Sequence, residues 1–140
     1  MAVFSVRSER ALANCDIKLQ EVLKAAIRRT DFAVIYGYRT PAEQWELYKQ
    51  GREKKGERWI KVGATVTNCD GKKVMSKHNR RPSQAVDIAP CGRDGKVMWT
   101  NIDAFERLAT VVLDEARRLG VRLQWGGLWK MKDYPHFELV

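Results

Sequence analysis

The stretch Gln84-Ala85-Val86-Asp87-Ile88-Ala89-Pro90 decides how this chain folds, because it has the composition of a buried central strand. Small and β-branched apolar residues surround a single carboxylate, and the proline stops the run. Side chains in a strand alternate between the two faces of a sheet. We therefore expect Val86 and Ile88 to pack on one face and Asp87 to point from the other.

The chain has two histidines, and each lies near carboxylates at a spacing that suits zinc. His78 precedes Asp87 by nine positions, and His136 lies in the segment Asp133-Tyr134-Pro135-His136-Phe137-Glu138. Two imidazoles and one carboxylate make a three-ligand zinc site whose fourth position is open to water. We therefore predict that His78, Asp87 and His136 bind Zn2+. The alternative, two ordinary structural histidines, leaves the neighbouring acids unexplained.

A hydrolytic zinc site also needs a base that accepts a proton from water. Asp133 is the predicted base, because a turn at Tyr134-Pro135 would bring its side chain to the metal. Glu138 shares the strand parity of His136 and is the alternative, either as the base or as a group that orients a ligand. Phe137 has the opposite parity and is expected to point away from the site.

Length and composition are those of an ordinary globular protein. The 140 residues fit one domain, which is predicted to span residues 1–140. A composition of 44% hydrophobic and 31% charged residues excludes a disordered chain. The N-terminus lacks the apolar core of a signal peptide, and no apolar run approaches the roughly 18 residues of a membrane helix. We expect a cytoplasmic, monomeric protein without stable membrane insertion.

The net charge of +9 calls for a polyanionic partner. Basic clusters lie at residues 52–55, 72–73 and 80–81. Nucleic acid and the anionic polymers of the bacterial cell wall both match this charge, and charge alone does not separate them. A generally solvated basic surface is the third interpretation.

Hydrophobic periodicity predicts an α+β fold with about three helices and a small, mostly antiparallel sheet. The helices are expected at about residues 9–29, from the capping box Thr40-Pro41-Ala42-Glu43 to near Gly51, and at about 102–119. The strands are expected at residues 31–37, 85–89, 121–125 and 135–139, with short ones at 58–62 and 64–67 and a hairpin turn at 68–71.

Taken in order along the chain, these motifs resemble those of the zinc peptidases of peptidoglycan. The resemblance spans nearly the whole sequence and rests on Gly37-Tyr38-Arg39-Thr40-Pro41-Ala42-Glu43-Gln44, Ser76-x-His78, Ser83-x-Ala85-x-Asp87, Trp125-Gly126-Gly127 and Asp133-x-Pro135-His136-Phe137-Glu138. That family groups VanY-like D-alanyl-D-alanine carboxypeptidases with phage endolysins that are L-alanyl-D-glutamate endopeptidases.

The resemblance implies roles for individual residues. His78, Asp87 and His136 would be the zinc ligands, and Asp133 the catalytic acid and base. Arg39 would stabilise the developing oxyanion or grip a substrate carboxylate, a task that suits a planar guanidinium. Two further residues, Ser76 and Gln44, would hydrogen-bond the substrate. The loop Asn79-Arg80-Arg81-Pro82 makes the His-to-Asp segment longer than in many family members. We expect this length to affect which stem peptide the enzyme accepts.

The function implied by the resemblance is zinc-dependent hydrolysis of the peptide stem of peptidoglycan by a phage or prophage endolysin. Such an enzyme would accumulate in the cytoplasm and reach the wall through a membrane lesion. A D,D- or L,D-carboxypeptidase of peptidoglycan is the alternative within the same chemistry. A basic nucleic-acid-binding module and a metal-free structural domain are less favoured alternatives from other classes.

Overall fold

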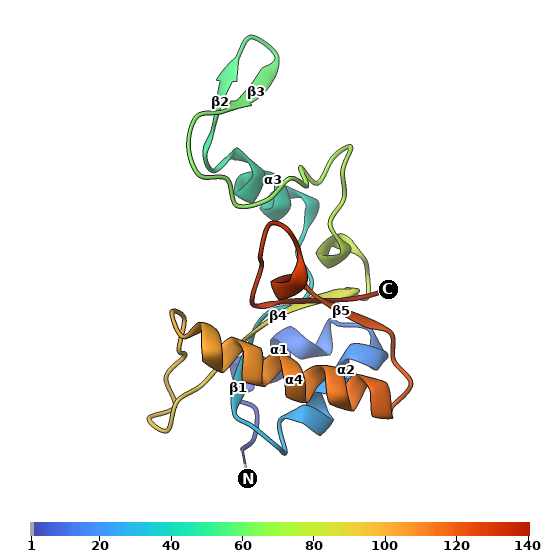
Figure 1. The fold of residues 1–140 in the computed structure, drawn as a ribbon. Coiled ribbons are helices and arrows are strands. Elements are labelled where there is room, and N and C mark those ends of the chain that lie inside the picture. The colour runs from blue at the N-terminus through green and yellow to red at the C-terminus, as the bar shows by residue number, and fades with distance from the viewer. Residues whose placement is uncertain (1) are drawn as a thin grey trace.

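The computed structural model describes residues 2–140, which form a four-stranded antiparallel sheet, a separate two-stranded hairpin and the helices that surround them (Figure 1). The elements in chain order are α1 (Val6–Ala13), α2 (Ile17–Ala26), β1 (Phe32–Tyr36), α3 (Pro41–Lys49), β2 (Arg52–Lys55), β3 (Arg58–Lys61), the 3₁₀ turn η1 (Lys77–Asn79), β4 (Ala85–Pro90), α4 (Ile102–Arg118), β5 (Leu123–Trp125), the 3₁₀ turn η2 (Gly126–Leu128) and β6 (His136–Leu139). The α+β class and the antiparallel sheet predicted from the sequence are confirmed.

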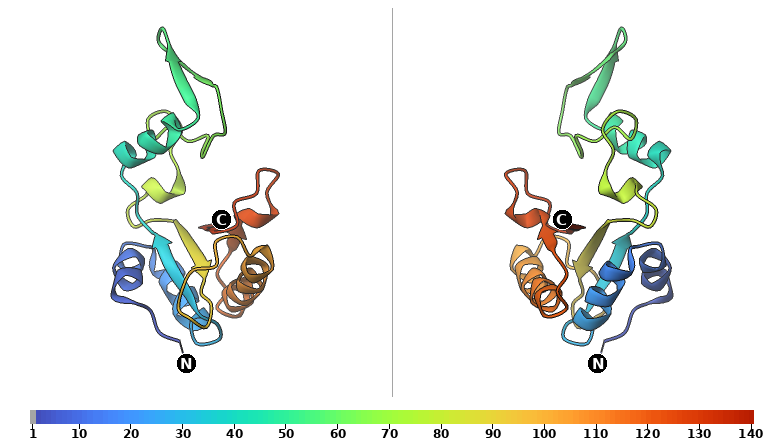
Figure 2. Two further views of the ribbon diagram at one scale, coloured as in Figure 1. Left: turned by 90° about the vertical axis from the view of Figure 1, so that its left-hand side faces the viewer. Right: turned by 90° about the vertical axis from the view of Figure 1, so that its right-hand side faces the viewer.

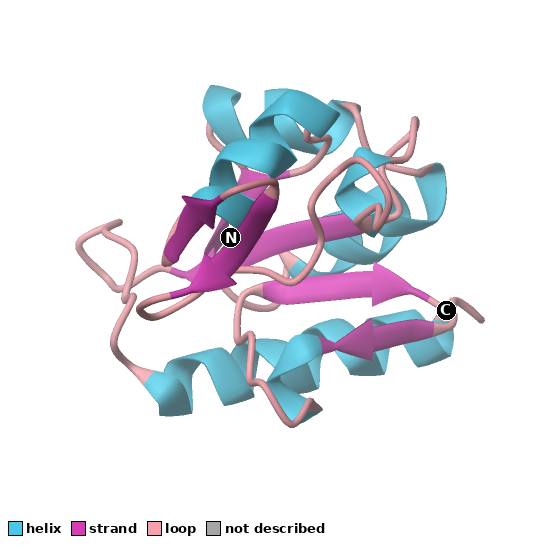
Figure 3. Ribbon diagram, turned by 90° about the horizontal axis from the view of Figure 1, so that it is seen from above, coloured by secondary structure: helices cyan, strands magenta, loops and turns pink. Residues whose placement is uncertain are grey.

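Strand β4 lies inside the sheet, whose order is β1-β4-β6-β5. It pairs antiparallel with β1 on one side and with β6 on the other, and this register sets Asp87 opposite His136 and Val86 opposite Phe137. Helices α1, α2 and α4 lie on one side of the sheet, and α3, η1 and η2 rise from the other (Figures 1 and 2). Seen from above, α4 runs along the sheet on the side of β5 (Figure 3).

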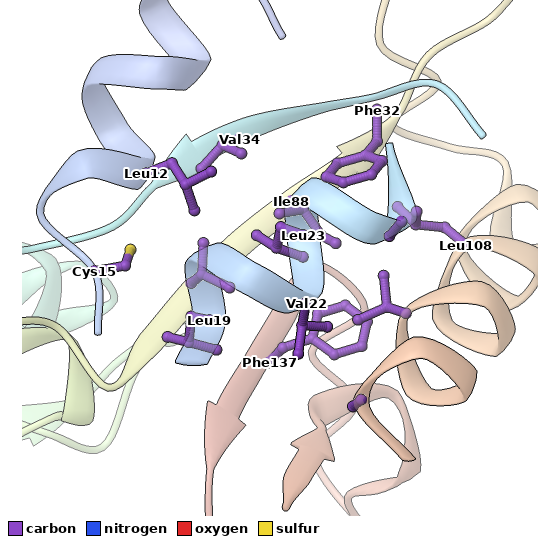
Figure 4. Close-up of a cluster of buried hydrophobic side chains, with 14 of the residues drawn as sticks. Leu12, Cys15, Leu19, Val22, Leu23, Phe32, Val34, Ile88, Leu108 and Phe137 are labelled. Carbon is purple, nitrogen blue, oxygen red and sulfur yellow. The ribbon is translucent and has the colours of Figure 1, made fainter. Parts of the chain in front are cut away.

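The core lies between the sheet and the layer formed by α1, α2 and α4 (Figure 4). Val86 and Ile88 are fully buried there, and Phe137 is 1% exposed and stacks on Trp125 with ring centroids 6.3 Å apart. The predicted alternation along β4 and β6 is therefore confirmed. Because the apolar residues of both strands occupy the core face, Asp87 and His136 are left to the opposite face.

The prediction of a single helix at residues 9–29 is wrong, because the helix is interrupted at Asn14-Cys15-Asp16 and forms two helices, α1 and α2. The side chain of Asp16 caps α2 by accepting a hydrogen bond from the Lys18 N–H. The backbone N–H of Asp16 donates to the Ser83 carbonyl over 2.8 Å, and the Ser83 N–H donates to the Asn14 carbonyl over 2.9 Å. Periodicity hid this break, since Cys15 is itself buried.

The basic stretch after α3 also differs from expectation. The strand predicted at 58–62 is present as β3, but it pairs with β2 around a turn at Gly56, whose φ is +63°. Residues 64–67 form no strand, and residues 68–71 are not a hairpin turn. Instead the carboxylate of Asp70 accepts backbone hydrogen bonds from residues 72, 73 and 74. The β2–β3 hairpin projects from the fold (Figure 2).

The other predicted elements are present. The capping box at Thr40 and Glu43 starts α3, with Pro41 in its first turn, and Gly120 follows the end of α4 with a φ of +71°. Within residues 2–140 no helix is both long and apolar enough to cross a bilayer.

Candidate functional site

The side chains of His78, Asp87 and His136 converge on the sheet face opposite the core. Nε2 of His78, Oδ1 of Asp87 and Nδ1 of His136 lie 3.2 Å from one another, so the three atoms form a nearly equilateral triangle. Both imidazoles are buried, and the carboxylate is mostly covered. This group could hold a metal ion, and the sequence predicted all three of its members.

His78 is fixed in place by hydrogen bonds on two sides. Its backbone N–H donates to the Ser76 hydroxyl, which caps η1, over 3.2 Å. Its ring Nδ1–H donates to the Gly37 carbonyl over 2.8 Å. Because a carbonyl only accepts, the proton of the neutral ring stays on Nδ1 and the lone pair of Nε2 faces Asp87.

Gly37 is a functional residue that the sequence reasoning did not assign. A side chain there would overlap the Ala11 carbonyl and lie 2.8 Å from Sγ of Cys15, so only glycine lets the α1–α2 corner approach β1. Its carbonyl accepts hydrogen bonds from His78 and from the Ser83 hydroxyl. The break between α1 and α2 is thus connected to the orientation of His78. No local sequence signal marks this role.

His136 is oriented from the opposite side by Glu138. The ring Nε2–H donates to the Glu138 carboxylate over 2.8 Å, and Lys77 lies 3.3 Å from the other oxygen of that carboxylate. Burial by itself lowers the pKa of His136, but hydrogen bonds to Asp87 and Glu138 raise it to about 9. Of the two roles considered for Glu138, this contact matches the orienting one. The ring of Trp129 lies 5.1 Å from that of His136.

The carboxylate of Asp87 carries the negative charge of the group. Burial alone raises its pKa, but the contacts with the His136 and His78 rings outweigh burial and hold the pKa well below its usual range. The other carboxylate oxygen lies 3.4 Å from the Arg39 guanidinium. Asp87 is therefore ionised at neutral pH and ready to accept a cation.

The turn predicted at Tyr134-Pro135 is present, and Asp133 lies near enough to the group for the charge of Asp87 to act on its carboxyl. The His136 N–H donates to the Asp133 carbonyl over 3.2 Å, and the Asp133 N–H donates to the Gly126 carbonyl over 2.9 Å. Residue 133 as a whole is exposed, but partial burial of its carboxyl, and then the negative charge of Asp87, raise the pKa of Asp133. A carboxyl with a raised pKa is better suited than an ordinary one to accept and return a proton.

Arg39 and Gln44 lie together beside the triangle. The Arg39 side chain is 11% exposed, and its guanidinium donates to Oε1 of Gln44 over 2.9 Å. Gln44 is fully buried and donates through Nε2 to the Thr67 hydroxyl and the Cys69 carbonyl. Its amide is therefore engaged with protein groups, which differs from the substrate contact predicted for it and instead holds Arg39.

A second residue that the sequence reasoning missed is Asn79, which completes η1. Its Oδ1 accepts from the Ser76 N–H over 2.9 Å, and its Nδ2 donates to the Arg39 carbonyl over 2.8 Å. The spacing of Ser76 and Asn79 is that of a capping box, so a local signal did exist. The predicted substrate residue Ser76 lies at the site, where its hydroxyl oxygen caps the turn that carries His78.

Comparison with known proteins adds independent information to this geometry. A family model described as phage L-alanyl-D-glutamate peptidase matches residues 1–140. The chain belongs to this family. The peptidase is 37% identical over 127 residues to the peptidoglycan L-alanyl-D-glutamate endopeptidase CwlK of Bacillus subtilis (strain 168), with 86% of this chain and 68% of the relative covered.

Two further matches cover almost the whole peptidase. The L-alanyl-D-glutamate peptidase of Escherichia phage T5 is 25% identical over 138 residues, covering 97% of this chain and 88% of the relative. The crystal structure of the L-Ala D-Glu endopeptidase ChiX of Serratia marcescens superposes with a TM-score of 0.73 at 30% identity, covering 99% of this chain and 90% of that one.

Family membership decides between the functions expected from the sequence. The chain is an L-alanyl-D-glutamate endopeptidase of the phage type, so the prediction of a hydrolytic enzyme acting on peptidoglycan is confirmed. The carboxypeptidase alternative is not favoured by any of these matches. The interpretations as a nucleic-acid-binding module or a metal-free structural domain lose their basis.

Proposed function

We propose that the peptidase cuts the L-alanyl-D-glutamate bond of the peptidoglycan stem with a zinc ion held by His78, Asp87 and His136. The spacing of the ligand atoms carries this proposal. Zinc bonds of about 2.0–2.1 Å at tetrahedral angles separate ligand atoms by about 3.3 Å, and the three donor atoms lie 3.2 Å apart. The donor set, two imidazoles and one carboxylate, leaves a fourth position open.

The hydrogen bonds around the ligands support the same assignment. The Gly37 carbonyl and the Glu138 carboxylate each hold one imidazole by the nitrogen that faces away from the triangle. Metal-binding histidines are commonly oriented in this way. When bound, zinc supplies a Lewis acid that polarises a carbonyl and lowers the pKa of water to about 7.

Asp133 is the residue that moves the proton in this proposal. Its carboxylate takes a proton from the attacking water and returns it to the amino group of the D-glutamate half as the amide bond breaks. The raised pKa of Asp133, due first to burial and then to the charge of Asp87, supports both halves of this exchange. Glu138 is not free for this role, because it accepts from His136 and lies against Lys77.

Arg39 stabilises negative charge on the substrate. One amino group of its guanidinium is held by Gln44, and the other lies 3.4 Å from Asp87, so the side chain is fixed before substrate arrives. Preorganised donors of this kind stabilise a developing oxyanion without reorganisation. A carboxylate of the substrate is the second group that this guanidinium fits.

The partners follow from the substrate. The peptidase acts as a monomer on the stem peptide, and its net charge of +9 attracts it to the anionic polymers of the wall. The peptidase reaches the wall by passing through a lesion in the membrane, and it does not insert into the membrane.

Mass spectrometry of wall fragments tests the proposal. Digestion of purified peptidoglycan should yield fragments ending in L-alanine and peptides beginning with D-glutamate.

Chelation of the metal should stop the reaction, and added zinc should restore it. Asp133→Asn should lower kcat by about 10²- to 10⁴-fold with near-stoichiometric zinc retained. Release of terminal D-alanine alone would show a carboxypeptidase instead.

A further inference from the structure

A basic arm stands beside the site and is not used by the chemistry described above. The arm comprises residues 49–73, namely the end of α3, the β2–β3 hairpin and the segment that returns toward η1. The chain leaves the site at Arg39 and returns to it at His78, so the segment 39–78, which contains the arm, is anchored at the site by both of its ends. The hairpin extends from the side of the sheet that carries the metal ligands (Figures 1 and 2).

The arm holds more than half of the net charge of the protein. Its 25 residues include eight lysines and arginines and three acidic residues, which gives +5 of the total +9. The side chains of Lys54, Lys55, Arg58 and Lys61 are exposed. Within the described residues 2–140, none of these four lies within 4.0 Å of a carboxylate. The arm therefore presents cations without partners in the fold.

Two cross-strand pairs in the hairpin bring like charges together. Lys55 is directly opposite Arg58, and Arg52 is directly opposite Lys61. Directly opposed residues of an antiparallel pair point to the same face, so like charges there destabilise the hairpin. The two side chains of the outer pair, Lys55 and Arg58, are exposed at the tip of the hairpin. An anion bound between these two side chains would offset their repulsion.

The hairpin is nevertheless held firmly against α3. Arg52 is 8% exposed, and its guanidinium donates to the carbonyls of Tyr48 and Thr67 over 2.6 and 3.0 Å. The same guanidinium lies 3.8 Å from the centre of the Tyr48 ring. Trp59 of β3 packs edge-on against Trp45 of α3, with ring centroids 5.4 Å apart. The exposed cations are thus presented by an ordered support rather than by a free loop.

We propose that this arm is a docking surface for peptidoglycan, binding carboxylates of stem peptides other than the one being cut. The inference rests on the proposed function, because it assumes that the polymer bound by the arm is the same peptidoglycan that is cut at the site. Charge complementarity supports it, and so does the path of the chain, which leaves the site at Arg39 before the arm and returns to the site at His78 after it. Strands of four residues extend roughly 13 Å, and the hairpin projects from the side of the sheet that carries the proposed metal ligands (Figures 1 and 2).

Binding to sacculi stripped of teichoic acids tests the arm. The variant is Lys55→Gln/Arg58→Gln, and the matched control is Lys24→Gln/Arg28→Gln. The control removes the same charge from exposed positions in α2 and in the turn after it, on the opposite side of the sheet (Figure 1). Both are measured by sedimentation in an Asp133→Asn background, which leaves the polymer intact. The Kd should rise about tenfold for the arm variant and less than twofold for the control.

Cleavage of a soluble stem peptide separates this inference from the proposed function. The arm variant with Asp133 intact should cleave that peptide at the parent rate, which also shows that it folds. If the parent itself cleaves no stem peptide, the proposed function fails. If the parent cleaves but both charge variants bind sacculi equally, the arm is not a docking surface. Loss of binding to DNA or to anionic vesicles, but not to sacculi, would assign the arm to that other partner.

Discussion

Glu138 accepts a hydrogen bond of 2.8 Å from Nε2 of His136, two positions earlier on β6. The two side chains share a face of the strand because the side-chain period of a strand is two. The contact turns Nδ1 of His136 toward Asp87, so a residue outside the triangle decides which nitrogen faces the metal position. The same strand face thus carries a proposed ligand, His136, and the group that orients it, Glu138.

Removing this contact should weaken metal binding before it affects the chemistry. We expect Glu138→Ala to lower zinc affinity by about 10- to 100-fold, the usual cost of losing such an orienting group. Glu138→Gln keeps an acceptor and should lose much less. Competition with a chromophoric chelator measures both affinities. Unchanged affinity with a large loss of kcat in Glu138→Ala would instead make Glu138 the base.

Gly126 should be essential for the position of Asp133. A Cβ at residue 126 would lie 2.5 Å from the Asp133 carbonyl oxygen and 3.0 Å from its Cβ. Gly126→Ala therefore displaces the proposed base, and a shift of about 1 Å can cost on the order of 100-fold in kcat. Gly63→Ala is the control, because its nearest neighbour lies 4.0 Å away. Equal kcat values on a soluble stem peptide for the two variants would contradict the role of Gly126.

Metal binding should release a proton near neutral pH. Burial lowers the pKa of His136, but its hydrogen bonds to Asp87 and Glu138 raise it to about 9, so Nδ1 is protonated in the metal-free protein at pH 7. Asp87, with its lowered pKa, is already ionised. Zinc affinity should therefore increase with pH and level off above about pH 9. Calorimetry at pH 7 in buffers of different ionisation enthalpy should find about one proton released; a value near zero would contradict this assignment.

Gln44 and Arg39 should act as a coupled pair. Gln44→Leu leaves the Arg39 guanidinium without its 2.9 Å acceptor, so we expect kcat to fall by about tenfold while the zinc content stays unchanged. In a double-mutant cycle with Arg39→Ala, the second substitution should add little once the first is present. Steady-state kinetics on a soluble stem peptide measures the cycle. Additive effects would show that Gln44 does not act through Arg39.

Residues with a local pattern were predicted correctly. The apolar alternation around Asp87 gave the central strand and its two faces, and the turn expected at Tyr134-Pro135 is present before β6. The capping box at Thr40 gave the start of α3. The prediction failed where the pattern was ambiguous. The buried Cys15 continued the helical period across the interruption between α1 and α2, so one helix was expected instead of two. The β2–β3 hairpin has little apolar alternation, so its pairing was not predicted.

The sequence by itself predicted the three residues that could hold a metal ion, the parity of the two strands that carry two of them, and the family. These follow from residue type and from a period of two along the chain, both of which are local. Only the tertiary structure decided which nitrogens face the centre of the triangle, since the Gly37 carbonyl lies 41 positions from His78 and the two imidazoles are 58 positions apart. Such contacts depend on the register between β1, β4 and β6 and on how closely a glycine lets two backbones approach. The position of the basic arm beside the site is decided in the same way, by where the chain leaves the sheet and where it returns.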